Sequence, residues 1–221
     1  MEANTKDSDT LHCGRRPATP EATSQAETRA RPAFSLERLA GEAALCRACG
    51  LCGPATQTVF GEGPSDARLM IVGEQPGDSE DLAGRPFVGP AGQLLDRALA
   101  AAGIERGQVY LTNAVKHFKF TPAGKKRLHA KPDYHEVAAC RPWLDNELAL
   151  VNPERIITLG ATAAQALLQR RVAVTRERGR PIEWQSRLIW PTIHPSYLLR
   201  TQDTNGLGFS RFVADLAAAI A

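Results

Sequence analysis

Hydrophobic and polar positions along the chain follow two alternating patterns. Four short apolar runs have strand length, and three of them are rich in β-branched residues: RLMIVGE (68–74), QVYLTNA (108–114), ERIITLG (154–160) and RLIWPTI (187–193). Helical periodicity marks AGQLLDRALAAAG (91–103), DYHEVAACRPWLDNELALV (133–151), ATAAQALLQR (161–170) and GLGFSRFVADLAAAIA (206–221). This alternation predicts an α/β fold in which a parallel sheet carries helices on both faces.

The same patterns divide the chain into a tail and one domain. Residues 1–33 are rich in Thr, Ser, Ala, Pro and Glu and show no hydrophobic period, which predicts a disordered tail. Helical spacing begins in FSLERLAGEAALC, with Ser35 available as the helix cap, so the folded domain is expected over residues 34–221. The stretch VTRERGRPIEWQSR predicts a turn or hairpin ahead of the last strand.

Length and composition narrow the class of protein. A chain of 221 residues, 43% hydrophobic, suits one domain with a full core. No apolar run approaches the roughly 18 residues of a membrane span, and the start has no signal pattern, so we expect a cytoplasmic protein without a membrane partner. Five cysteines favour metal binding or free thiols over a disulfide scaffold, and Cys13 in the tail is expected to be free.

Positive charge is concentrated in two segments although the net charge is only +3. Residues 116–141 hold seven Lys or Arg against two Asp or Glu, and residues 170–180 hold five Arg against one Glu. Either segment could face phosphate groups, although a charge run taken alone is more often a solvated surface.

Polar side chains follow the predicted strands at their carboxyl ends, where ligand sites of parallel sheets lie. Gly73 lets backbone approach a ligand, and Glu74, Gln75 and Phe87 add a carboxylate, an amide and a flat ring that suit a planar heterocycle. Asn113 offers the paired donor and acceptor that read a pyrimidine edge. His194 follows the last strand and could donate to a developing oxyanion, or be only a hydrogen-bonded core residue.

Cysteines in the sequence Cys46-Arg-Ala-Cys49-Gly-Leu-Cys52 indicate a metal centre, because two thiolates three residues apart can reach one centre. Cys140 adds a more distant thiol. Zinc and an iron–sulfur cluster both accept these ligands, and the spacing does not separate them.

Six ordered motifs, GEQPG, RPFVGPAGQLLDRALAAAGI, YLTNAVKH, ACRPWL, LGATAAQALL and HPS, resemble those of the iron–sulfur uracil-DNA glycosylases of the family-four type. The resemblance runs from about residue 36 to the end of the chain. Within that group, GKKRLH (124–129) resembles the Lys-Arg-Arg-Ile-His loop of the X-type glycosylases, which become covalently joined to uracil-containing DNA. Lys126 and Leu128 replace Arg and Ile, and the histidine is retained as His129.

The resemblance implies a three-layer α/β/α sandwich with a four-stranded parallel sheet and a [4Fe-4S] cluster. It places the cluster on Cys46, Cys49, Cys140 and His117, with Cys52 as the alternative to His117. Its substrate would be uracil-containing DNA, single-stranded by preference, bound by a monomer.

Together, the residues and the resemblance predict a mechanism. Uracil would flip out of the strand, stack on Phe87 and be recognised by Asn113, with Gly73 and Gln75 close to the base. His194 would stabilise the departing base, and Glu74, with Gln75 beside it, would offset the positive charge of the sugar or orient the attacking group.

His129 would then attack C1′ and leave a lasting protein–DNA bond. Phosphates would be bound by Lys125, Lys126, Arg127, Lys131 and Ser196. The alternatives are an ordinary multiple-turnover glycosylase, a non-enzymatic iron–sulfur DNA-binding or redox-sensing module, and a zinc-stabilised structural protein.

Overall fold

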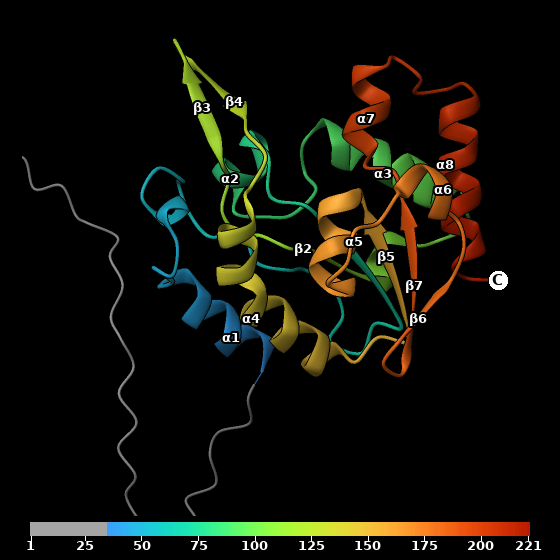
Figure 1. Ribbon diagram of the computed structural model, residues 1–221, viewed down its shortest axis with the longest axis horizontal. Helices are drawn as coiled ribbons and strands as arrows, with labels where there is room; N and C mark the ends of the chain where they lie inside the picture. The colour runs from blue at the N-terminus through green and yellow to red at the C-terminus, as the bar shows by residue number, and fades with distance from the viewer. Residues whose placement is uncertain (1–34) are drawn as a thin grey trace, which may run out of the picture.

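A five-stranded sheet organises the computed structural model, which describes residues 35–221 (Figure 1). The strand order is β2-β1-β5-β7-β6, where β1 is Leu69–Gly73, β2 Val109–Asn113, β5 Arg155–Leu159, β6 Ile182–Trp184 and β7 Arg187–Thr192. The first four strands in this order run parallel, and they are the four predicted from the apolar runs. The predicted tail and Cys13 lie outside the described residues.

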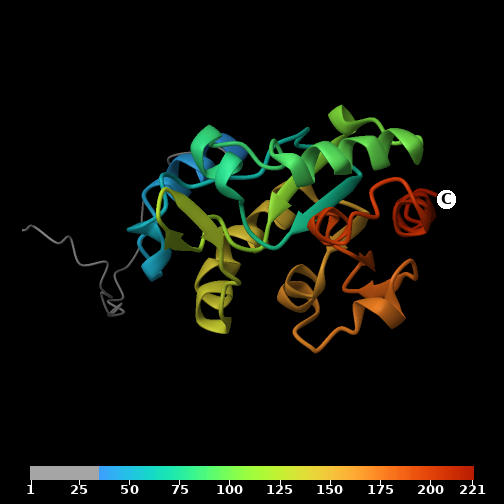
Figure 2. The ribbon, with the colours of Figure 1, turned by 90° about the horizontal axis from the view of Figure 1, so that it is seen from above.

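Helices cover both faces of the sheet, as Figure 2 shows from above. On one face lie α3 (Pro90–Ala101), α7 (Pro195–Arg200) and α8 (Leu207–Ala218), and on the other α4 (Tyr134–Val151) and α5 (Ala161–Leu168). Alternate residues of β1 serve the two layers: Ile71 packs in the core under α3, and Met70 and Val72 pack in the core under α4. The predicted three-layer α/β/α fold is confirmed.

The predicted count of four strands is wrong because the segment before β7 adds a fifth. β6 pairs with β7 in antiparallel fashion and closes the edge of the sheet, with Gln185 in the left-handed region (φ 53°) at the turn. The sequence predicted a turn or hairpin here, and this hairpin is confirmed. The short helix α6 (Val174–Glu177) precedes it.

The basic segment 120–129 forms a second hairpin that projects from the body (Figure 1). β3 (Phe120–Ala123) and β4 (Lys126–His129) pair antiparallel, with Phe120 opposite His129. Gly124 occupies the turn with φ +60°, a conformation that glycine adopts without steric cost. The expected loop is therefore a β-ribbon, and its backbone pairing fixes where His129 lies.

The remaining elements connect the strands and add one more helix to the layer formed by α4. Ser35 caps α1 (Leu36–Ala44) as predicted, with its hydroxyl accepting from the Arg38 amide, and α1 packs against α4. A short 3-10 helix, η1 (Gly50–Cys52), follows α1, and a second 3-10 helix, η2 (Arg106–Gln108), precedes β2. The helix α2 (Asp78–Ala83) follows β1. Within residues 35–221, no helix is both long and apolar enough to span a membrane.

Candidate functional site

Asn113 and Phe87 meet at the carboxyl ends of β1 and β2. Gly73 pairs with Asn113 across the two strands. A Cβ at Gly73 would lie 2.3 Å from Asn113 Oδ1 and 2.7 Å from Phe87 Cζ, so only glycine leaves room for both side chains. Asn113 is 2% exposed, and its Oδ1 has no hydrogen-bond partner. A buried, unpaired acceptor beside an aromatic ring suits a planar ligand that brings its own N–H.

Glu74 follows directly and is oriented from two sides. Thr162, in the first turn of α5, donates its hydroxyl to Glu74 Oε2 at 2.5 Å. On the other side, His129 Nε2 lies 3.6 Å from Glu74 Oε1, and the His129 side chain is half exposed. The hairpin thus brings His129 close to Glu74, although the two residues are far apart in sequence.

His194 caps the N-terminus of α7 and is held as a neutral ring. Its Nδ1 accepts from the Ser196 amide at 3.2 Å and lies 2.8 Å from Ser196 Oγ. Burial, with smaller contributions from His129 and Arg200, lowers the pKa of His194 to about 4. Since Nδ1 accepts a backbone N–H, the neutral ring carries its proton on Nε2, where it can serve as a donor.

Gln75 anchors the hairpin to the body. Its Nε2 donates to the carbonyl oxygens of Lys119 and Ala130, both at 3.1 Å, and its Oε1 accepts from the Lys119 amide at 3.2 Å. These residues flank the hairpin on both sides. The Gln75 amide is thus bound to protein rather than open to a ligand, which differs from the direct part in ligand binding that the sequence suggested.

Arg127 clamps the hairpin onto α2. It donates to Asp78 Oδ1 at 2.6 Å and to Asp81 Oδ2 at 2.5 Å, and its guanidinium lies 5.1 Å from the centre of the Phe120 ring. Asp81 is fully buried. The predicted phosphate contact by Arg127 therefore competes with two carboxylates that already neutralise its charge.

The lysines of the hairpin and Ser196 are placed differently. Lys125 and Lys126 are exposed on the hairpin and Lys131 is exposed beside it, whereas Ser196 is hydrogen-bonded to His194. In the second basic segment, Arg170 pairs with Glu177 and Arg178 with Asp215. Because its last residue, His129, lies beside Glu74, the projecting hairpin is the better candidate for phosphate binding at this site.

Three thiols gather in one corner between η1 and α4. Cys49 and Cys140 pack in the same apolar cluster, and Trp143 Nε1 donates to Cys46 Sγ at 3.3 Å. Burial raises the pKa of Cys140 to about 12, and Cys49 and Cys46 add to this rise. The Lys116 amide donates to Cys140 Sγ at 3.2 Å.

This donor set fits a soft metal centre. Bound iron would replace the thiol protons, and N–H donors to sulfur tune iron–sulfur sites. His117 is 4% exposed, and burial lowers its pKa. Its Nε2 lies 2.9 Å from Thr58 Oγ1, so Nδ1 is the ring nitrogen that would bind a metal. In residues 35–221, however, no three His, Cys, Asp or Glu side chains are arranged to hold a single metal ion. Cys52 Sγ lies 3.2 Å from the Cys49 carbonyl oxygen.

Sequence reasoning missed three residues of this region. Thr162 lies in the LGATAAQALL motif, at the start of α5, but its hydroxyl contact with Glu74 depends on strand order. Asp81 shows no local signal for its pairing with Arg127. Tyr197 is 50% exposed next to Ser196. The motif HPSY shows an aromatic residue at this position, but its exposure is visible only in the fold.

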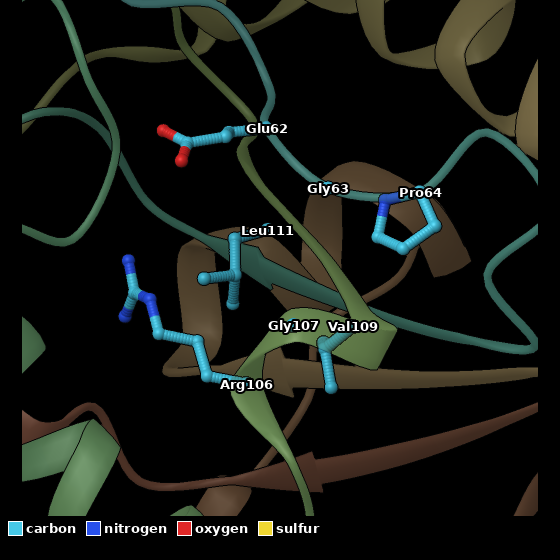
Figure 3. Close-up of a pocket in the computed structure, with 7 residues that line it drawn as sticks. All are labelled: Glu62, Gly63, Pro64, Arg106, Gly107, Val109 and Leu111. Carbon is cyan, nitrogen blue, oxygen red and sulfur yellow. The ribbon is translucent and has the colours of Figure 1, made fainter.

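A groove of about 400 Å³ lies elsewhere, at the start of β2 (Figure 3). It is lined by Glu62, Gly63, Pro64, Arg106, Gly107, Val109 and Leu111. Asn113 is at the opposite end of this strand, so the groove is separate from the carboxyl-edge site.

Comparison of the sequence with known proteins identifies a family. The family model described as "Uracil DNA glycosylase superfamily" matches residues 60–217. A type-4 uracil-DNA glycosylase of Thermotoga maritima is 43% identical over 159 residues, covering 71% of this chain and 79% of the relative. One of Sulfurisphaera tokodaii is 36% identical over 174 residues (75% and 76%), and a type-5 uracil-DNA glycosylase of Pyrobaculum aerophilum is 31% identical over 153 residues (62% and 64%). The chain belongs to the uracil-DNA glycosylase superfamily.

Proposed function

We propose that this protein excises uracil from DNA by hydrolysing the N-glycosidic bond, with multiple turnovers. The observation that carries the proposal is the buried, unpaired Oδ1 of Asn113 beside the Phe87 ring. Uracil offers an N–H at position 3 next to a carbonyl at position 4, which complements the Asn113 amide. The type-4 relatives, named as uracil-DNA glycosylases, support this activity.

Bond cleavage in this proposal divides the charge between two residues. As the bond from C1′ to the base breaks, its electron pair stays on uracil, and Nε2–H of neutral His194 donates to the resulting oxyanion. Glu74, oriented by Thr162, offsets the positive charge on the sugar and accepts a proton from the attacking water. One such oxyanion donor is worth about 3 kcal/mol of barrier.

Uracil release from a single-stranded oligonucleotide with one uracil tests this function. Released uracil should exceed the molar amount of protein, and the product should break at the abasic site in alkali. Matched oligonucleotides with thymine or cytosine should stay intact. Equal binding of all three without cleavage would instead support the non-enzymatic DNA-binding module.

Covalent capture by His129 is a second candidate, favoured by one observation. The ring lies 3.6 Å from Glu74 and is half exposed, so it faces the residue that would activate water. In this version an imidazole nitrogen bonds to C1′ as uracil leaves with the electron pair, and the ring proton passes to Glu74. The hydrolytic version comes first because the type-4 relatives carry the glycosylase name and nothing in their names implies capture.

A denaturing gel separates these candidates. Capture predicts a protein–DNA band that resists SDS and heat and is lost in His129→Ser. Hydrolysis predicts no such band and free uracil in excess over protein. The Lys126→Ala variant removes a proposed phosphate contact on the same strand but keeps the histidine, so under capture it should weaken the band without abolishing it.

Phosphate binding is proposed for Lys125 and Lys126 on the hairpin and for Lys131 beside it. Ser196, next to His194, is proposed as a further phosphate contact. Such contacts release counterions, so binding should weaken as salt rises. An unpaired strand reaches the pocket without the cost of breaking base pairs, which favours single-stranded DNA. Binding that does not change between low and high salt would contradict the role of the lysines.

We further propose that Cys46, Cys49, Cys140 and His117 hold a [4Fe-4S] cluster. The three neighbouring thiols and the buried neutral imidazole support this assignment. When bound, such a cluster would brace the corner formed by η1, α4 and the segment after β2. If Cys52→Ser loses iron while His117→Ala keeps it, Cys52 is the fourth ligand instead.

A further inference from the structure

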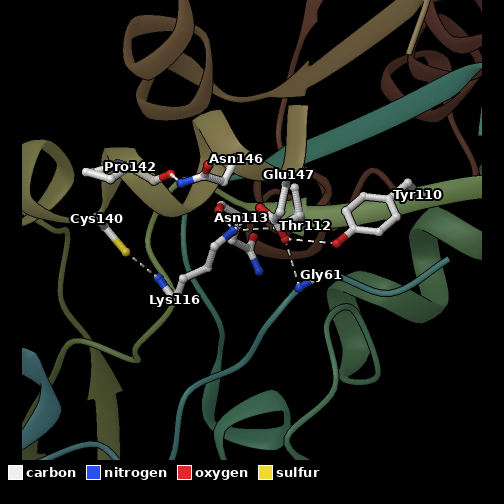
Figure 4. Close-up of polar contacts among 9 residues, drawn as sticks. All are labelled: Gly61, Tyr110, Thr112, Asn113, Lys116, Cys140, Pro142, Asn146 and Glu147. Atoms are coloured by element: carbon white, nitrogen blue, oxygen red, sulfur yellow. Dashed lines mark hydrogen bonds and ion pairs between the residues drawn. The ribbon is translucent and has the colours of Figure 1, made fainter. Parts of the chain in front are cut away.

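A buried ion pair lies directly behind Asn113 and has no part in the chemistry proposed above (Figure 4). Lys116 is 1% exposed and Glu147 on α4 is 0% exposed, with Nζ and Oε2 2.5 Å apart. Nζ also donates to Thr112 Oγ1 at 2.6 Å and to the Asn113 carbonyl oxygen at 2.8 Å. The ammonium thus has three acceptors and grips the backbone of the proposed base-reading residue.

The carboxylate of Glu147 joins further segments to this pair. Its Oε1 accepts from the Gly61 amide and the Tyr110 hydroxyl, both at 3.1 Å, and from the Thr112 hydroxyl at 2.9 Å. A Cβ at Gly61 would lie 2.4 Å from this oxygen, so the approach of the loop requires glycine. β2, α4 and the loop before β1 therefore meet at one carboxylate.

Stability alone is a weak reason for such a pair. Removing two charges from water is costly, and well-packed apolar side chains of similar size often stabilise a core as well or better. A buried pair does, however, impose directional contacts that apolar packing lacks. In this protein the directional contacts hold the turn after β2, because Lys116 lies in that turn and binds the backbone carbonyl of Asn113.

The turn itself carries residues of both proposed sites. It begins at Asn113 and reaches His117, and the Lys116 amide donates to Cys140 Sγ at 3.2 Å. Cys140 and Glu147 are seven residues apart on α4, which places them on the same helix face two turns apart. One lysine therefore contacts the base-reading residue through its side chain and the sulfur corner through its backbone.

We propose that Lys116 and Glu147 are positioning residues that fix the turn from Asn113 to His117, so that the Asn113 amide is held ready for the base. The proposal rests on the proposed function. It assigns base discrimination to an ion pair that touches neither the base nor the DNA. Without the pair, the backbone carbonyl of Asn113 loses its ammonium partner, and the side-chain amide of Asn113 samples several positions.

The test is the double variant Lys116→Met/Glu147→Gln. It removes both charges together, so no buried charge is left unpaired, and the side-chain amide introduced on α4 keeps an oxygen for the Gly61 amide. Inhibition by free uracil reports the base pocket without DNA contacts. We expect the uracil inhibition constant to rise about 30-fold or more, and uracil to lose most of its advantage over cytosine, while the circular dichroism spectrum is unchanged.

Two further variants keep the test decisive if the double variant folds poorly. Thr112→Val removes only the hydroxyl that bridges the pair, and should raise the inhibition constant by about fivefold. The control Arg68→Ala/Glu154→Ala removes an exposed pair next to β1 and β5 and should change nothing. Unchanged uracil inhibition in Thr112→Val and in a folded double variant would overturn the proposal.

A second measurement separates this inference from the proposed function. Amide hydrogen exchange over residues 113–117 should speed up in the double variant and not in the control, whatever the reaction. If wild type releases no uracil, the proposed function fails and the base-reading role fails with it. If wild type releases uracil and the turn exchanges at the wild-type rate in the double variant, only the positioning role fails.

Discussion

Replacing Arg127 by Met should loosen the β3–β4 hairpin without unfolding the domain. The hairpin is attached by the Arg127 clamp to Asp78 and Asp81 and by the amide of Gln75. Arg127 and His129 lie two positions apart on β4 and share a face of the ribbon. Loss of the clamp should therefore displace His129 as well.

The size of the effect follows from the burial of Asp81. Removing one partner of a fully buried pair costs about 3–5 kcal/mol. The Arg127 side chain is 22% exposed, and Asp81 keeps the Thr56 amide at 3.0 Å, so we expect about 2 kcal/mol. Because the hairpin projects from the body, the lost interaction lowers the free energy of local hairpin opening and not that of global unfolding. About 2 kcal/mol corresponds to roughly 30-fold more opening.

Hydrogen exchange of residues 120–129 measures this opening. The matched control is Asp78→Asn, which weakens only the half-exposed pair and should raise exchange about twofold, since exposed pairs contribute about 0.5 kcal/mol. If Arg127→Met lowers the melting temperature while hairpin exchange is unchanged, the clamp supports the core and not the ribbon. If neither quantity changes, the two ion pairs contribute nothing measurable.

Three other predictions concern the pocket, acid stability and the sulfur corner. Asn113→Ala should slow uracil release about 100-fold in a single-turnover assay, whereas an equal rate would remove Asn113 from base recognition. His194 is neutral in the fold with a pKa of about 4 against an ordinary 6.5, so the unfolded chain takes up the proton first. The stability contributed by neutral His194 is therefore complete above pH ~6.5 and declines towards pH ~4, by at most about 3 kcal/mol, and His194→Gln should flatten this part of a thermal unfolding series. Cys140→Ser should lower iron per protein and the visible absorbance of a purified sample, and unchanged iron would contradict its role as a ligand.

The sequence by itself determined the layers of this protein. Apolar runs of strand length alternate with helical periods, and burial on both faces makes such strands uniformly hydrophobic, so β1, β2, β5 and β7 were predicted within about one or two residues. The carboxyl ends of parallel strands share one edge, which is why Glu74, Asn113 and His194 were predicted together. The ordered motifs supplied the family.

Tertiary structure decided which partners these residues have. Arg127 reads as a phosphate ligand in a basic run, yet it pairs with Asp78 and Asp81, 46 or more positions away. Lys116 belongs to the basic segment 116–141 and Glu147 carries no local signal, yet both side chains are buried where α4 packs against β2. Local pattern reports the period of an element and its buried face. The partner of a charge depends on which elements the fold brings together, and that information is spread over the whole chain.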